Sequence, residues 1–194
     1  MDLGWGNQKA NKWVTNVGLI TTDGPDGQDI MAAEWTYYVS YSPALISVHI
    51  GGSIKGEKKK ATFENILSTQ EFGVSIAASD QNVLSSIAGK GSGRDVDKIA
   101  VLREMGVEFY PAKQIKVRMV KGAATNAECK VKEMLDVGDH VMVIGEVLEI
   151  ESDQSKIPLI YSGNKYWAMG AQIGKPQQET LDKIDALLKK YSKV

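Results

Sequence analysis

Cysteine, histidine and long apolar runs are all scarce in this chain of 194 residues. Cys129 is the only thiol, which excludes an internal disulfide, and His49 and His140 are the only histidines. Without paired cysteines or an HExxH spacing, a structural zinc site is not expected. No stretch approaches about 18 consecutive apolar residues, the length that a membrane-spanning helix needs. The first residues also lack the apolar segment of a signal peptide, so the sequence predicts a cytoplasmic protein.

A surplus of charge of either sign is missing as well. Lys and Arg number 23 and Asp and Glu number 24, which leaves a formal net charge of −1. Nucleic-acid-binding domains usually carry a basic excess, so an RNA-binding β-barrel, suggested only by tryptophans and lysines, is a weak alternative. Hydrophobic residues make up 43% of the chain. This composition and length predict one globular domain over residues 1–194.

Most of the chain has the pattern of short β-strands separated by turn residues. The strands are expected at 13–22, 30–40, 44–50, 71–77, 124–135, 140–151, 159–162 and 165–170. Helices are expected at 61–69, from Ser79 or Asp80 to 88, from Asp97 to 105, and at 176–191. Strands and helices do not alternate regularly, which argues against a doubly wound parallel sheet. A mainly β fold with inserted helices and a C-terminal helix is therefore predicted, with a closed barrel removing exposed strand edges.

The strand expected over residues 140–151 does not alternate apolar and polar residues, as a strand with one solvent-exposed face would. Both faces of residues 141–148 are largely apolar, which is expected where a sheet is covered on both sides.

The glycines at 89, 91 and 93 resemble part of a dinucleotide-binding fingerprint. They follow a predicted helix instead of a strand, so a surface loop is the better interpretation.

The segment from Lys55 to Thr62 is the strongest local candidate for a binding site. Four lysines precede a predicted helix start, and Thr62 offers a hydroxyl in the first turn. Free N–H groups at a helix N-terminus, together with nearby cations, form a natural phosphate site. A solvated lysine run is the alternative interpretation of the same residues.

Three further features have both a functional and a structural interpretation. Trp35 and Trp167 could border a flat aromatic ligand, or fill a core or an interface. The charged cluster from Arg94 to Lys98 could serve a ligand, or cap a helix through local ion pairs. His140 could donate a proton or hydrogen-bond a cofactor at the mouth of a cleft, or be a turn residue satisfied locally.

Taken in order, these segments resemble one known family. They are Leu19–Thr22, Asp29–Trp35, Ser42–Pro43, Lys59–Asn65, Glu71–Val74, Ser92–Lys98, Ala127–Cys129 and Gly138–Val147. The set resembles the flavin-reductase-like FMN-binding split-barrel family, and the Ser92–Lys98 segment is most similar to flavoredoxin-type members. The resemblance implies a six-stranded antiparallel split β-barrel with a core of about residues 14–170. It also implies a homodimer with one non-covalent FMN per subunit near the interface.

The resemblance also implies roles for individual residues around FMN. Those on the strand lining the flavin are Glu34, Trp35 and Thr36, and those in the loop beneath its ring or ribityl chain are Gly51 and Ser53. Lys59 and Thr62 match the phosphate end, although Lys58 and Lys60 leave open which lysine holds phosphate. Ser92 and Lys98 match the loop near the isoalloxazine, and Trp167 matches an aromatic residue near the C-terminal strands. His140 is the candidate catalytic residue.

The implied function is a flavoprotein oxidoreductase that transfers electrons through FMN. A flavoredoxin-type carrier would exchange electrons with a redox protein, and a reductase would take hydride from NAD(P)H to supply reduced flavin. A non-catalytic flavin-binding module is a third possibility. FMN is favoured over FAD because the sequence offers one basic helix start and no second phosphate loop. Aromatic residues beyond the core runs favour the homodimer, namely Trp5, Trp13, Tyr37, Tyr38, Tyr166 and Trp167.

Overall fold

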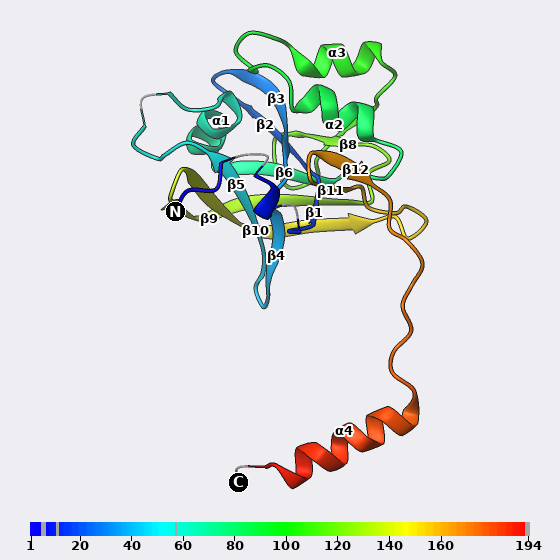
Figure 1. The fold of residues 1–194 in the computed structure, drawn as a ribbon. Helices are drawn as coiled ribbons and strands as arrows, with labels where there is room; N and C mark the ends of the chain where they lie inside the picture. Colours follow the sequence, from blue (N-terminus) through cyan, green and yellow to red (C-terminus); the bar gives the residue numbers. More distant parts are fainter. Residues whose placement is uncertain (5–6, 11, 57, 193–194) are drawn as a thin grey trace.

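The computed structural model describes residues 1–4, 7–10, 12–56 and 58–192. Its largest element is a seven-stranded antiparallel sheet of order β3-β2-β6-β9-β10-β5-β4 (Figure 1). These strands are β2 (Gly18–Gly24), β3 (Gly27–Ala33), β4 (Thr36–Tyr41), β5 (Ala44–Gly51), β6 (Glu71–Ile76), β9 (Thr125–Val137) and β10 (His140–Ser152). Two smaller sheets consist of β1 (Thr15–Asn16), β11 (Ile160–Ser162) and β12 (Lys165–Trp167), and of β7 (Phe109–Pro111) and β8 (Arg118–Val120).

The main sheet curls around one apolar core. Met31 on the end strand β3 and Val48 on β5 belong to the same buried cluster, although several strands separate β3 from β5 in the sheet order. Only a curled sheet brings these strands together, so the expected mainly β split-barrel fold is confirmed, with seven strands in place of six. Gly145 on β10 allows close packing inside the barrel, because a Cβ there would lie 2.5 Å from Phe72 Cζ.

Three helices pack on one side of the barrel: α1 (Ala61–Thr69), α2 (Asn82–Ala88) and α3 (Lys98–Glu104) (Figure 1). Phe63 and Ile66 of α1 enter the barrel core. A second apolar core lies between the β2–β3 hairpin and the pair α2–α3. The expected bounds of α1 are confirmed, and Asp97 caps α3 by accepting a hydrogen bond from Ala100 N at 2.9 Å. Neither Ser79 nor Asp80 caps α2, whose N-cap is Gln81.

The prediction of a single strand over residues 30–40 was wrong, because β3 ends at Ala33 and β4 begins at Thr36. At the break the Thr36 hydroxyl donates to the Ala33 carbonyl at 3.1 Å. Gly18 makes room for this side chain, since a Cβ there would lie 2.2 Å from Thr36 Oγ1. The break lets β3 pair with β2 while β4 turns to pair with β5, and it leaves Glu34 and Trp35 between the two strands.

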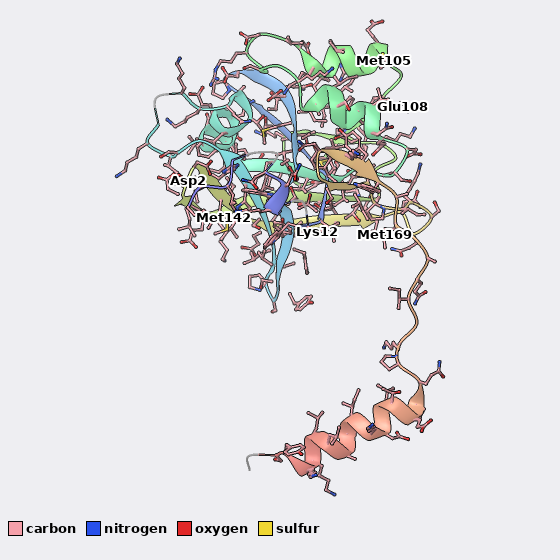
Figure 2. The ribbon with its side chains drawn as sticks, viewed as in Figure 1. Asp2, Lys12, Met105, Glu108, Met142 and Met169 are labelled. Atoms are coloured by element: carbon pink, nitrogen blue, oxygen red, sulfur yellow. The ribbon has the colours of Figure 1, made fainter. Side chains whose placement is uncertain are left out.

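One face of β9 and β10 stays uncovered, contrary to the expectation for residues 141–148. Val141 and Val143 face the barrel core, whereas Met142 and Ile144 are only half-buried. Leu135 lies opposite Met142, and His49 of β5 flanks it on the other side. We call this surface, formed by Leu135, Met142, His49, Trp35 and Tyr37, the outer face. Figure 2 shows Met142 on the side of the sheet opposite to Met105 and Glu108, which lie near α3.

The C-terminal part of the chain leaves the barrel. Residues 168–177 are exposed and form neither helix nor strand. They lead to α4 (Gln178–Lys190), which stands apart from the other elements in Figure 1. The only other helix described is a short 3-10 turn, η1 (Gln8–Ala10). Within the described residues, no helix has both the length and the apolar character needed to cross a membrane.

Candidate functional site

Aromatic and imidazole rings gather on the outer face where β4, β5 and β10 lie side by side. The ring centroids of Trp35 and His140 are 4.7 Å apart, and His49 lies 6.1 Å from both Trp35 and Tyr37. The Trp35 carbonyl accepts a hydrogen bond from the backbone N–H of His49 at 3.0 Å, which holds the break after β3 against β5. Trp35 is still 42% exposed. A large aromatic surface is thus held in place and remains open to a ligand.

Gly51 links this ring cluster to the start of α1. It pairs with His140 across the β5–β10 ladder. A Cβ on Gly51 would lie 3.7 Å from Lys60 Cε and 3.8 Å from His140 Nε2, so both side chains lie beside this glycine. Neither distance is a clash, so packing within the chain does not demand glycine here. Gly51 therefore has no side chain of its own between a cation and an imidazole, and we call this position the recess.

The charges around the rings have definite physical causes. His140 Nδ1 lies 2.7 Å from Asp139 Oδ1, and this hydrogen bond lowers the pKa of the Asp139 carboxyl. A carboxylate at Nδ1 favours a proton on that nitrogen, and Nε2 lies beside Gly51. Partial burial and then the neighbouring His140 lower the pKa of His49. The lowered pKa favours the neutral form of His49.

A carboxyl group lies at the edge of the same cluster. Partial burial raises the pKa of Glu34 in the break between β3 and β4. Burial, and then the charge of Glu34, raise the pKa of both Tyr37 and Tyr161. Glu34 thus lies close enough to influence hydroxyls from both β4 and β11. Its position is compatible with the lining role that the sequence resemblance implied.

The lysines that precede α1 make different contacts. Lys59 Nζ donates to the Gly56 carbonyl at 2.6 Å, and the Lys59 carbonyl accepts from Arg94 Nη1 at 2.7 Å. Lys60 is the N-cap residue of α1, and its side chain extends toward Gly51. The Lys60 side chain makes no capping hydrogen bond to the first turn of α1. The cation beside the recess is therefore Lys60, whereas Lys59 holds its own loop together.

Arg94 anchors the loop of residues 89–97 to α1. Besides the Lys59 carbonyl, its guanidinium contacts Asp26 at 3.2 Å and forms a short ion pair with Glu64. The hydrogen bond from Arg94 is the main cause that lowers the pKa of Glu64. The sequence placed Arg94 only in a charged cluster, and the structural interpretation of that cluster, local ion pairs, is the one that the structure shows for this residue.

Two residues expected at the flavin are instead part of a buried network centred on Asp29. Lys98 is 3% exposed and its ammonium lies 3.0 Å from Asp29 Oδ1. Thr62 is 1% exposed and its hydroxyl donates to Asp29 Oδ2 at 2.5 Å. Gly93 packs against the same carboxylate, because a Cβ there would lie 2.5 Å from Asp29 Oδ1. The predicted contact of Lys98 and Thr62 with the flavin stays a prediction; in the structure these side chains join α1, α3 and β3 to one another.

The other expected site residues lie around the recess or away from it. The Thr36 side chain is buried at the strand break, so only its backbone can face a ligand. Ser53 lies in the loop after β5, where its carbonyl accepts from Gly56 N at 3.2 Å. The Ser92 hydroxyl accepts from Arg94 N at 3.2 Å within the 89–97 loop. Trp167 is exposed on β12 of the three-stranded sheet, and its indole N–H donates to Ser162 O at 3.0 Å.

Residues 11–170 match the domain family described as "Flavin reductase like domain". The chain belongs to the flavin reductase-like family. A relative from Pyrococcus abyssi, an uncharacterized protein, is 30% identical over 130 residues, covering 67% of this chain and 69% of the relative. The FMN reductase (NADH) RutF of Pseudomonas syringae is 26% identical over 150 residues, covering 77% of each chain.

Solved structures of low sequence identity share the fold. Flavoredoxin of Desulfovibrio vulgaris matches with a TM-score of 0.72 at 23% identity, covering 93% of this chain and 100% of that chain. The NADH:FAD oxidoreductase SgcE6 of Streptomyces globisporus matches with a TM-score of 0.73 at 19% identity, covering 85% of this chain and 93% of that chain. The flavin reductase-like split-barrel architecture is thus confirmed by structure as well as by sequence.

His49 of the ring cluster and Lys60 of the recess are two residues that sequence reasoning did not select. His49 was considered only as one of two histidines, since nothing in a strand pattern shows which residues another strand will bring beside it. Lys60 was one of three consecutive lysines, and the side-chain directions within such a run depend on where the helix begins. The signal available was the start of α1 itself, because the N-cap position is Lys60.

Proposed function

We propose that this protein is an FMN-dependent oxidoreductase of the flavoredoxin type, which passes electrons through non-covalently bound FMN. The observation that carries the proposal is the recess at Gly51, where Trp35, His140 and Lys60 converge at the start of α1. It occurs in a chain whose residues 11–170 match the flavin reductase-like domain. An aromatic wall, a proton-exchanging imidazole and a cation suit a planar cofactor that bears a phosphate.

The residues present fit FMN at both of its ends. Trp35 and the backbone of Glu34 and Thr36 offer a surface for the ring, and Gly51 leaves room where a Cβ would otherwise stand. The first turn of α1 and Lys60 offer N–H groups and a positive charge for one terminal phosphate. A single basic helix start favours FMN over FAD. Ser53 and Ser92, in the flanking loops, are proposed to complete the site.

Bound FMN would supply the capacity to accept a hydride or single electrons, and the chain's own residues would bind it and manage protons. His140, oriented by Asp139, holds or releases a proton at Nε2 on the Gly51 side. Lys60 adds positive charge, which favours anionic groups at the recess. We assign His140 the role of proton donor and Trp167 that of a more distant aromatic contact.

The physiological electron donor separates two versions of the function. A carrier would receive electrons from a redox protein, whereas a reductase would take hydride from NAD(P)H, as the name of the relative FMN reductase (NADH) RutF states for that protein. The similarity of the Ser92–Lys98 segment to flavoredoxin-type members supports the carrier version. A non-catalytic flavin-binding module would have the same recess without electron transfer.

An anaerobic visible spectrum tests the proposal. The purified protein is expected to show the bands of bound flavin, and dithionite is expected to bleach them. Little bleaching by NADH or NADPH over minutes is expected for a carrier, whereas rapid bleaching identifies a reductase. A protein that neither retains FMN nor binds it when FMN is added would contradict the flavoprotein assignment.

Lys60→Ala is expected to weaken FMN binding roughly tenfold, because the phosphate loses a charge-assisted partner at a partly hydrated site. Fluorescence quenching during FMN titration measures the dissociation constant. Lys58→Ala is the matched control, because Lys58 belongs to the same run and is exposed; it is expected to change affinity by less than about twofold. Equal losses in both variants would show that only the general charge of the loop matters.

We also propose that the outer face is the interface of a homodimer. Large side chains remain exposed there and nearby: Trp35, Tyr37, Tyr38, Tyr41, Leu135 and Val137. Such a surface resembles the apolar centre of a subunit interface. Of the aromatics that favoured a dimer in the sequence, Tyr166 instead bonds to Ser85 and Ser86 within the chain, and Trp5 lies outside the described residues. The recess borders this face, so FMN would lie close to both subunits.

A further inference from the structure

The C-terminal helix α4 carries an apolar stripe and stands apart from its own barrel (Figure 1). Its apolar residues recur every three to four positions, the spacing of one helix face, at Leu181, Ile184, Leu188 and Tyr191. Ile184, Leu188 and Tyr191 are exposed, and no residue of α4 is buried. Glu179 in the first turn and Lys189 and Lys190 in the last turn complement the helix dipole. The segment is thus a well-formed amphipathic helix that lacks a packing surface.

The segment that joins α4 to the barrel directs it away from its own body. Residues 168–177 are exposed, and an extended chain of this length spans at most about 36 Å. In Figure 1 they carry α4 below β4 and β10, whereas α1, α2 and α3 lie above the sheet. The helix α4 therefore lies on the same side of the barrel as the uncovered outer face. In the proposed homodimer the second subunit would sit on that side.

A helix of 13 residues is only marginally stable by itself in water. Isolated helices shorter than about 12–15 residues are marginal, and tertiary packing of an apolar face supplies most of their stability. The charges of α4 balance, with Glu179, Asp182 and Asp185 against Lys183, Lys189 and Lys190. A neutral polar face does not favour an anionic lipid surface, which attracts basic amphipathic helices. A neutral protein surface suits it, and the chain itself has a net charge of only −1.

We infer that α4 is an exchanged arm, which packs its apolar stripe on the body of the partner subunit in the homodimer. The inference rests on the homodimer proposed above. It adds to the contact at the outer face a second contact, between α4 and the body of the partner subunit. Each arm leaves its own barrel after β12 and lies on the other barrel. Two-fold symmetry makes the two arm contacts identical, so any stabilisation by one arm is gained twice.

Paired substitutions in the full-length chain test the arm. Ile184→Ser with Leu188→Ser is expected to raise the dissociation constant of the dimer roughly a hundredfold, because two apolar anchors are lost from each arm. Lys183→Ser with Ala186→Ser introduces the same number of serines at exposed positions off the stripe and is expected to leave the constant unchanged. Sedimentation equilibrium measures all three proteins. Equal dissociation constants for the two double variants would overturn the inference.

A cross-linking experiment establishes which chain the arm touches. Cys129 is buried, and burial raises the pKa of its thiol to about 12, so a thiol introduced by Leu187→Cys beside the stripe is the reactive one. Photolysis of a benzophenone attached there, with the labelled chain mixed with an unlabelled, size-tagged chain, is expected to give a covalent mixed dimer. Cross-links confined to the labelled chain would overturn the inference.

Flavin spectra recorded on the same samples separate this inference from the proposed function. A protein that binds FMN but forms no inter-chain cross-link contradicts the arm and leaves the flavoprotein assignment in place. A protein that forms the mixed dimer but binds no FMN contradicts the assignment and supports the arm.

Discussion

Lys98→Met is expected to lower the free energy of unfolding by about 3–5 kcal/mol, because it leaves the Asp29 carboxylate buried without its cation. The ammonium and the carboxylate lie 3.0 Å apart, and both side chains are almost fully buried. The Thr62 hydroxyl, which donates to the other carboxylate oxygen, compensates only part of that charge. Urea unfolding followed by circular dichroism measures the loss.

Two controls separate the buried pair from a general effect of losing a lysine. Lys90→Met removes an exposed lysine within the loop of residues 89–97 and is expected to change stability by less than about 0.5 kcal/mol. Adding Asp29→Asn to Lys98→Met is expected to recover at least about 1 kcal/mol, because no uncompensated charge then remains. A Lys98→Met variant with the parent's free energy of unfolding but a lower flavin midpoint potential would contradict this prediction. That result would show that Lys98 faces the flavin.

Leu135→Glu is expected to raise the dissociation constant of the proposed homodimer at least roughly a hundredfold, because it places a charge at the centre of a desolvated apolar contact. Leu135 is 38% exposed and lies opposite Met142 on the outer face. FMN affinity is expected to fall as well, since a ligand held near the interface and subunit association stabilise each other. Light scattering and FMN titration measure the two effects.

The matched control for this change lies on the opposite side of the molecule. Val101 on α3 is 41% exposed, so Val101→Glu adds the same charge at a similar exposure. It is expected to leave both the dimer and the FMN affinity unchanged. A Leu135→Glu protein that remained dimeric would show that the outer face is not the interface.

Much of the fold followed from local sequence patterns, because those patterns depend on neighbouring residues. The helix over residues 61–69 and the strand pair around Gly138 were predicted from periodicity and turn residues, and both are confirmed. Asp97 as the cap of α3 was predicted for the same reason, since a cap bonds to a backbone N–H three residues away. The short strands β7 and β8 had no such signal and were missed.

The strand break at Glu34 and Trp35 shows where local patterns stop being sufficient. Residues 30–40 are continuously strand-like, yet the chain turns there because Thr36 fits against Gly18 of a different strand. That fit is a tertiary contact, and nothing in the 30–40 segment encodes it alone. This break in the strand exposes Trp35 and places its ring beside that of His140. The two rings form the centre of the candidate site.

The sequence by itself determined the family, the mainly β architecture and the region of the site, because ordered motifs and local periodicity survive without knowledge of contacts. Only the tertiary structure decided which polar residue serves which purpose. Lys98 and Thr62 have the chemistry of ligand contacts, but both are bonded to Asp29, a residue of β3 that packing brings between their helices. Lys60 became the cation of the recess because the curl of the sheet places Gly51 and His140 beside the start of α1. The type of a polar side chain is written in the sequence, whereas its partner depends on the path of the whole chain.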